Sequence, residues 1–133
     1  MLETPFKLDL DSGVPVYRQI IDQVTSGIAV GSLKPGFQLP TVRQLAVDLA
    51  INPNTVVRAY RELEIRGILE TQQGTGTFIS DQKPDLEIAE RERRLDQLVK
   101  DFVARAGAGG FTVTQLIDRL TALQPPTSRK KGK

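Results

Sequence analysis

The sequence predicts a mainly α-helical protein with a small β-wing: a winged helix-turn-helix domain over residues 1–82, then a two-helix hairpin over residues 83–123. Apolar residues recur at helical spacing in several segments. Two of the predicted helices are short and nearly consecutive, and a glycine-rich turn between two apolar pairs follows them. The remaining segment, 124–133, is expected to be a disordered basic tail, because it holds four cations and no apolar residue.

The first predicted helix follows the turn "SGVP", where Pro15 suits an early helical position. One apolar stripe defines it: Tyr17, Ile20, Ile21, Val24 and Ile28. Gly31 is expected to end this helix. The next residues, "SLKPGFQLP", are typical of a turn-rich connection.

Two short helices with clear start signals come next. Thr41 and Gln44 have the spacing of a capping box, and the stripe behind them is Val42, Leu45, Ala46 and Leu49. Asn52 is then expected to cap a third helix whose first residue is Pro53. Its predicted core positions are Val56, Ala59, Tyr60 and Leu63, which leaves Asn54, Thr55, Arg58 and Arg61 facing outward. This arrangement predicts a helix-turn-helix.

Gly67 closes the third helix, and "ILETQQGTGTFIS" then indicates a β-hairpin with a glycine-rich tip at Gly74-Thr75-Gly76. A hairpin in this position makes the module winged.

The C-terminal pair of helices raises a question of burial. A long helix carries Leu95, Leu98, Val99, Phe102, Val103 and Ala106 on one stripe, and "GAGG" at 107–110 interrupts it. Thr112 and Gln115 predict a capping box, Phe111 and Leu116 a hydrophobic staple, and Val113, Leu116, Ile117 and Leu120 a second stripe. Two helices of this size do not bury such stripes against each other alone. We therefore expect a homodimer through Leu95, Leu98, Val99, Phe102, Leu116, Ile117 and Leu120, the alternative being that the pair docks back on the winged module.

Composition argues against an enzyme. The chain has no cysteine and no histidine, which excludes disulfides, thiolate chemistry and histidine acid–base catalysis. "GTGTF" lacks the lysine of a phosphate-binding P-loop, and no EF-hand spacing occurs, so no cofactor and no metal are expected. No apolar run approaches the roughly 18 residues of a membrane span, and the N-terminus lacks the apolar segment of a signal peptide, so we expect a cytoplasmic protein with no membrane partner.

The net charge of +2 is unevenly distributed. Residues 1–82 hold 7 Lys+Arg and 9 Asp+Glu, residues 83–123 hold 7 of each, and the four cations of the last ten residues are unopposed. Overall charge therefore says nothing about the folded part, and any nucleic-acid face must be a local concentration of cations.

Residues 14–80 contain "LKPG..LP", "R.LA..L", "NTV.RAY.EL...G" and "G.GTF", and on these motifs the segment resembles the DNA-binding domain of the GntR family of bacterial regulators. The "NPNTV.RAY" form and the short helical pair look like the YtrA-like subfamily, whose members lack a large effector-binding domain and dimerise through two helices. The resemblance implies a dimeric repressor that binds a palindromic double-stranded DNA operator. It leaves a small-molecule effector undetermined. The alternative is a winged-helix module that binds proteins. Pro53 and Val57 depart from the family pattern, because arginine is common at both positions.

The resemblance also implies which residues contact DNA: Thr41, Arg43, Asn52, Asn54, Thr55, Arg58, Gly74, Thr75 and Gly76. Arginine pairs with guanine and asparagine with adenine, and a helix N-terminus favours phosphate. Each assignment has a competing interpretation: local capping for the residues at 52–55, a solvated surface for Arg43, and an ordinary turn for the wing tip. Phosphate contact and plain solvation are equally open for Lys34, Arg61 and Arg66.

Overall fold

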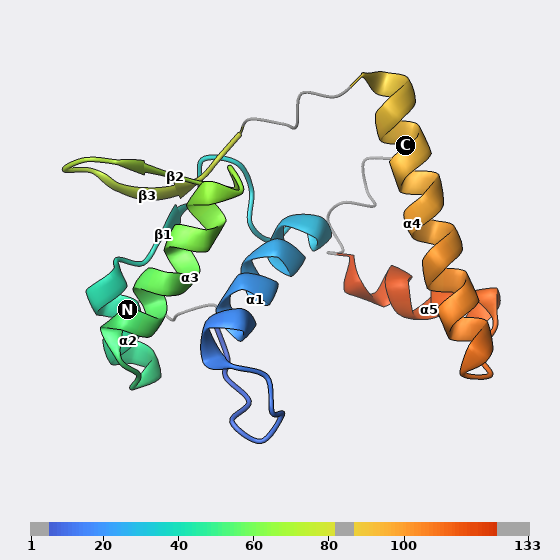
Figure 1. The fold of residues 1–133 in the computed structure, drawn as a ribbon, viewed down its shortest axis with the longest axis horizontal. Coiled ribbons are helices and arrows are strands. Elements are labelled where there is room, and N and C mark those ends of the chain that lie inside the picture. The colour runs from blue at the N-terminus through green and yellow to red at the C-terminus, as the bar shows by residue number, and fades with distance from the viewer. Residues whose placement is uncertain (1–5, 82–86, 125–133) are drawn as a thin grey trace. The chain divides into compact units, whose positions relative to one another are not determined.

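A computed structural model of the chain describes residues 6–81 and 87–124, and it divides the chain into two compact units, Met1–Gln82 and Lys83–Lys133 (Figure 1). Nearly all of the predicted tail, 125–133, lies outside the described residues. None of the helices in the described ranges has both the length and the apolarity needed to cross a membrane.

The first unit contains three helices and three short strands. In chain order these are α1 (Val16–Val30), β1 (Gln38–Leu39), α2 (Val42–Leu49), α3 (Pro53–Ile65), β2 (Leu69–Gln72) and β3 (Gly76–Ile79). Helix α3 packs on both α1 and α2, while the β2–β3 hairpin projects away from the helices (Figure 1). The predicted helix-turn-helix and wing are thus present.

The core is a single cluster, and the predicted apolar stripes of all three helices contribute side chains to it. Its most fully buried large side chains are Ile20, Val24, Leu45, Val56 and Leu63. The first stripe was predicted one residue too long: Ile28 is exposed. Leu33 folds back over the last turn of α1 and packs against Gly27, where an added Cβ would lie 2.7 Å from the Leu33 Cδ1 atom. The core therefore continues on the side of the last turn that carries Gly27, and not on the side that carries Ile28.

The starts of α2 and α3 are capped by the predicted residues. Thr41 Oγ1 accepts from the Gln44 N–H at 3.0 Å, and Asn52 Oδ1 accepts from the Asn54 N–H at 2.8 Å, with Pro53 at the first helical position. Each bond satisfies a backbone donor that the helix itself leaves unpaired.

A third strand, β1, is the main difference from the predicted fold. The sheet order is β1-β3-β2, all antiparallel, with Gln38 opposite Phe78 and Leu39 opposite Thr77. Residues 38 and 39 fall in the segment predicted as a turn-rich connection. Two residues are too few to show an alternating pattern, and their partner strand lies far along the chain, so pairing alone identifies them as a strand.

Two glutamines of α1 hold the residues before the helix. The buried Gln19 accepts from the Asp9 N–H at 2.8 Å and donates to the Asp9 carbonyl at 3.0 Å, and one turn later Gln23 accepts from the Lys7 N–H at 2.9 Å. The side-chain amides thus take the place of a neighbouring strand. They hold the segment that brings Phe6 into the core.

The second unit is a pair of helices, α4 (Ile88–Ala108) and α5 (Val113–Leu123). Helix α5 leaves α4 at a steep angle and does not run back along it (Figure 1). Gly107 was predicted to begin the break, but α4 continues through it to Ala108, and the chain then turns at Gly110, which has a φ of 89°. The predicted Thr112–Gln115 capping box is present.

Candidate nucleic-acid interface

The candidate interface is built on the exposed side of α3. Asn54, Arg58 and Arg61 follow each other at i, i+4 and i+7 and are all exposed, whereas the opposite side of the helix is buried. Thr55, also predicted to face outward, is only half-buried. The predicted outward orientation is therefore confirmed for Asn54, Arg58 and Arg61. Their contact with DNA stays a prediction.

Asn52 has a structural task at this end of the helix. Its side-chain oxygen is engaged by the Asn54 N–H, as the capping interpretation predicted. The amide of Asn54 itself, by contrast, has no hydrogen-bond partner among residues 6–81 and 87–124, and it projects from the first turn. Of the two asparagines, Asn54 is therefore the one whose donor and acceptor groups are both available to a ligand.

Arg58 is exposed but not unconstrained. Its guanidinium carbon lies 3.7 Å from the centroid of the Tyr17 ring, which belongs to the first turn of α1. Tyr17 was predicted to lie in or near the core, and it is half-buried against the core cluster. The contact between its ring and Arg58 was not predicted, because it depends on how α1 crosses α3.

Helix α2 contributes Arg43 in its first turn, and the side chain is exposed. The chain just before this helix is fixed by Tyr60, whose hydroxyl donates to the Pro40 carbonyl at 2.7 Å. Burial raises the pKa of the Tyr60 hydroxyl well above its ordinary value. The group therefore stays a proton donor, and it ties α3 to the start of α2.

The wing tip is a turn from Gln72 to Thr75, closed by the Thr75 N–H donating to the Gln72 carbonyl at 2.9 Å. Gly74, at the third position, has a φ of 80°, which the turn requires and glycine adopts freely. Thr75 is exposed, so its hydroxyl can approach a ligand, whereas its N–H is already engaged in the turn.

Gln38 of β1 supports this tip, a role that was not predicted. Its Nε2 donates to the Thr75 carbonyl at 3.0 Å and lies close to where a Cβ on Gly76 would stand. Gly76 has a φ of 142°, a backbone conformation that favours glycine, and a side chain there would also displace the Gln38 amide. Whether Gly76 also contacts DNA stays a prediction.

Three exposed arginines of the helix-turn-helix have no ion-pair partner among the described residues. Arg43, Arg58 and Arg61 have no carboxylate within ion-pair distance in the described ranges, whereas Arg66 at the end of α3 pairs with Glu62 at 3.1 Å. The charges of these three exposed arginines are therefore not engaged by a carboxylate of the described residues. An unpaired, exposed cation is the kind of group that contacts a phosphate backbone.

The comparisons with known proteins agree with this geometry. The family described as "Bacterial regulatory proteins, gntR family" matches residues 16–79. The chain is 37% identical over 110 residues to the HTH-type transcriptional repressor YtrA of Bacillus subtilis, covering 83% of this chain and 85% of that protein. It is 40% identical over 115 residues to the HTH-type transcriptional regulator Rv1152 of Mycobacterium tuberculosis, with coverages of 86% and 90%. Among solved structures, YtrA from Sulfolobus acidocaldarius, a GntR-family transcription factor, is similar with a TM-score of 0.58 and 32% identity, over 79% of this chain and 99% of that one.

Proposed function

Because the chain belongs to the GntR family of bacterial regulatory proteins and is a DNA-binding transcriptional regulator, we propose that it acts as a homodimeric repressor of a palindromic operator. Its similarity to a protein named as a repressor supports the direction of control. The same relatives are regulators and not enzymes, and they favour DNA binding over a protein-interaction module.

The exposed side of α3 carries the proposal for DNA recognition. In a helix-turn-helix the first residues of the second helix reach base edges in the major groove. Asn54 and Arg58 occupy that place, with amide and guanidinium groups suited to adenine and guanine respectively. Arg43 then contacts a phosphate at the start of α2, and the tip at Thr75 contacts the backbone or the minor groove beside it.

The second unit supports the proposal of a dimer. Leu95, Leu98, Val99 and Phe102 share one side of α4, and between 45% and 66% of each side chain is exposed. Neither α4 nor α5 has a buried side chain within the described residues. Exposed apolar stripes of this length are unfavourable in water. A second copy related by a two-fold axis would cover them and would pair two recognition helices.

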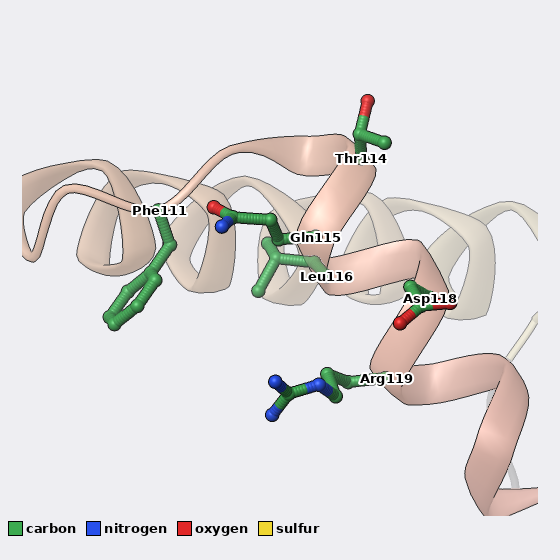
Figure 2. Close-up of a pocket in the computed structure, with 6 residues that line it drawn as sticks. All are labelled: Phe111, Thr114, Gln115, Leu116, Asp118 and Arg119. Carbon is green, nitrogen blue, oxygen red and sulfur yellow. The ribbon is translucent and has the colours of Figure 1, made fainter.

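A hollow of about 640 Å³ lies at the start of α5, where two apolar side chains and several polar ones line it. Figure 2 shows Phe111, Leu116 and Arg119 pointing to the same side of the helix, while Thr114 points away. Phe111 and Leu116 are the pair predicted to form the staple. With Phe111 still 58% exposed, this hollow is part of the surface that we assign to the partner subunit.

The proposed base-reading role of α3 is tested by selecting bound duplexes from a random pool. The tightest-binding duplex is then titrated with the wild type and with variants. Arg58→Ala is expected to lose about 1–3 kcal/mol of discrimination at one base pair of each half-site. Arg43→Ala should weaken all duplexes alike and reduce the salt dependence by about one phosphate contact. Arg66→Ala is the matched control, since its charge is paired with Glu62. Unchanged discrimination in Arg58→Ala would rule out the proposed role of α3.

The dimer is tested by sedimentation of full-length protein. Phe102→Glu places a charge on the apolar stripe and should produce monomers, with operator affinity lower by about 10²–10⁴-fold because the two half-sites are no longer linked. Ala104→Glu, an exposed position on the other side of α4, is the control and should remain dimeric. A Phe102→Glu variant that still sediments as a dimer would show that this stripe is not the interface.

A further inference from the structure

We infer that Tyr17 is a positioning residue for DNA recognition: its ring holds the Arg58 guanidinium in place before DNA binds. The inference rests on the proposed contact between Arg58 and the operator, and it adds a residue from α1 to a recognition surface otherwise built from α2, α3 and the wing. The observation that carries it is the 3.7 Å separation between the Arg58 guanidinium carbon and the Tyr17 ring centroid.

The geometry leaves the hydrogen-bonding edge of Arg58 available. At 3.7 Å from the ring centroid, the guanidinium meets the ring with its flat face, since an N–H pointed at the ring would hold the carbon farther away. The five N–H donors of an arginine lie in the plane of the group. Stacking therefore uses none of the donors with which Arg58 would pair with guanine or phosphate.

The ring is itself well fixed. Tyr17 is half-buried and packs against the core cluster, and it lies in the first turn of α1, the helix that packs against α3. Arg58 has no carboxylate within ion-pair distance in the parts of the chain that the structure describes. The tyrosine ring is thus the group that selects the side-chain conformation of Arg58, and it does so without neutralising the charge that DNA requires.

Pre-ordering of this kind strengthens binding. A long side chain that is free in solution loses conformational entropy when DNA immobilises it, whereas a stacked one has already lost most of it. Removing the ring should therefore weaken operator binding about three- to tenfold, the range that corresponds to ordering one such side chain. The loss should fall on the operator and not on unrelated duplexes, because only the operator offers Arg58 its specific partner.

The test is a double-mutant cycle on full-length protein, titrated against the selected operator and against an unrelated duplex. Tyr17→Leu should weaken operator binding about three- to tenfold, and Tyr17→Phe, which keeps the ring, should stay within about twofold of the wild type. In an Arg58→Ala background, Tyr17→Leu should have no further effect. Melting temperatures are measured for every variant, and Tyr17→Met replaces Tyr17→Leu should the latter unfold.

The outcomes separate this inference from the proposed function. An equal effect of Tyr17→Leu in both backgrounds, or an equal effect on operator and unrelated duplex, would mean that Tyr17 acts only through the fold and would overturn the inference. An Arg58→Ala variant that binds the operator normally would overturn the proposed role of Arg58 first, and this inference with it. Loss of binding in Arg58→Ala without coupling to Tyr17 would overturn the inference alone.

Discussion

Ala50, at the end of α2, has a left-handed backbone conformation with a φ of 56° and a ψ of 47°. It is the one residue other than glycine with a positive φ among those that the structure describes. The Ala50 N–H donates to the Val47 carbonyl and the Ile51 N–H to the Ala46 carbonyl, the pattern in which a helix commonly ends on glycine. An alanine here carries a steric cost that glycine does not.

Ala50→Gly is therefore expected to raise the free energy of unfolding by about 0.5–1 kcal/mol, after allowing for the larger entropy of glycine in the unfolded chain. Urea denaturation measures the change. Ala29→Gly, at an exposed position in the last turn of α1, is the control and should lower stability by up to about 1 kcal/mol. A destabilising Ala50→Gly would contradict the assignment of strain to this residue.

The Tyr60 hydroxyl is a second single-residue determinant. Tyr60→Phe removes the donor to the Pro40 carbonyl and should cost about 1–2 kcal/mol at neutral pH. Burial raises the pKa of Tyr60 in the folded state, so above about pH 10 the unfolded chain loses this proton while the folded one keeps it. Above about pH 10 the free energy of unfolding should therefore fall more steeply for the wild type than for Tyr60→Phe. The difference in free energy of unfolding between the two proteins should narrow. A difference that stays constant between pH 7 and pH 11 would refute this explanation.

At the scale of single elements, the start of α3 serves the fold and the proposed DNA contact at once. Asn52 caps the helix and therefore stands beside the residues assigned to base reading. Replacing Asn52 by aspartate separates helix capping from DNA contact, because aspartate caps a helix as well as asparagine does but adds a negative charge.

Asn52→Asp should keep the melting temperature near that of the wild type but weaken binding to every duplex, since a carboxylate is repelled by phosphates. Asn52→Ala should instead lower the free energy of unfolding by about 1 kcal/mol. Thermal melts and anisotropy titrations on both variants supply the measurements. Normal DNA binding by Asn52→Asp would place this helix start away from the phosphate backbone.

The wing depends on contacts from outside the hairpin. Gln38 reaches the Thr75 carbonyl from β1, and Thr71 of β2 donates to a carboxylate oxygen of Glu64 at the end of α3. These bonds restrain the tip relative to the recognition helix. That restraint matters if both elements contact one duplex.

At the scale of the whole molecule, the two units differ in how they can be stable. The first has a buried core of its own, whereas α4 and α5 have no buried side chain within the described residues. Stability of the second unit should then come from association.

Thermal unfolding followed by circular dichroism should accordingly show two components. The component from α4 and α5 should shift to higher temperature over about a hundredfold increase in protein concentration, and the component from residues 1–82 should shift much less. Phe102→Glu should abolish the concentration dependence. Melting that is independent of concentration throughout would contradict the proposed dimer.

The sequence by itself determined the local features. The caps at Thr41, Asn52 and Thr112 and the core stripes of α2 and α3 were predictable, because they depend on residues within a turn or two of each other. The outward orientation of Asn54 and Arg58 followed from the same 3.6-residue period.

Tertiary structure decided the contacts between segments distant in the chain. Strand β1 and the stacking of Tyr17 on Arg58 join such segments. The hydrogen bonds of Gln19 to Asp9 and Val14 and the packing of Leu33 beside Gly27 join residues that are nearer in the chain but lie outside one helix or strand. A strand of two residues, a single glutamine and a single tyrosine are too short to show a repeating pattern in the sequence. Their partners depend on how α1 crosses α3 and on where β3 lies beside β1, and only the packed core determines both.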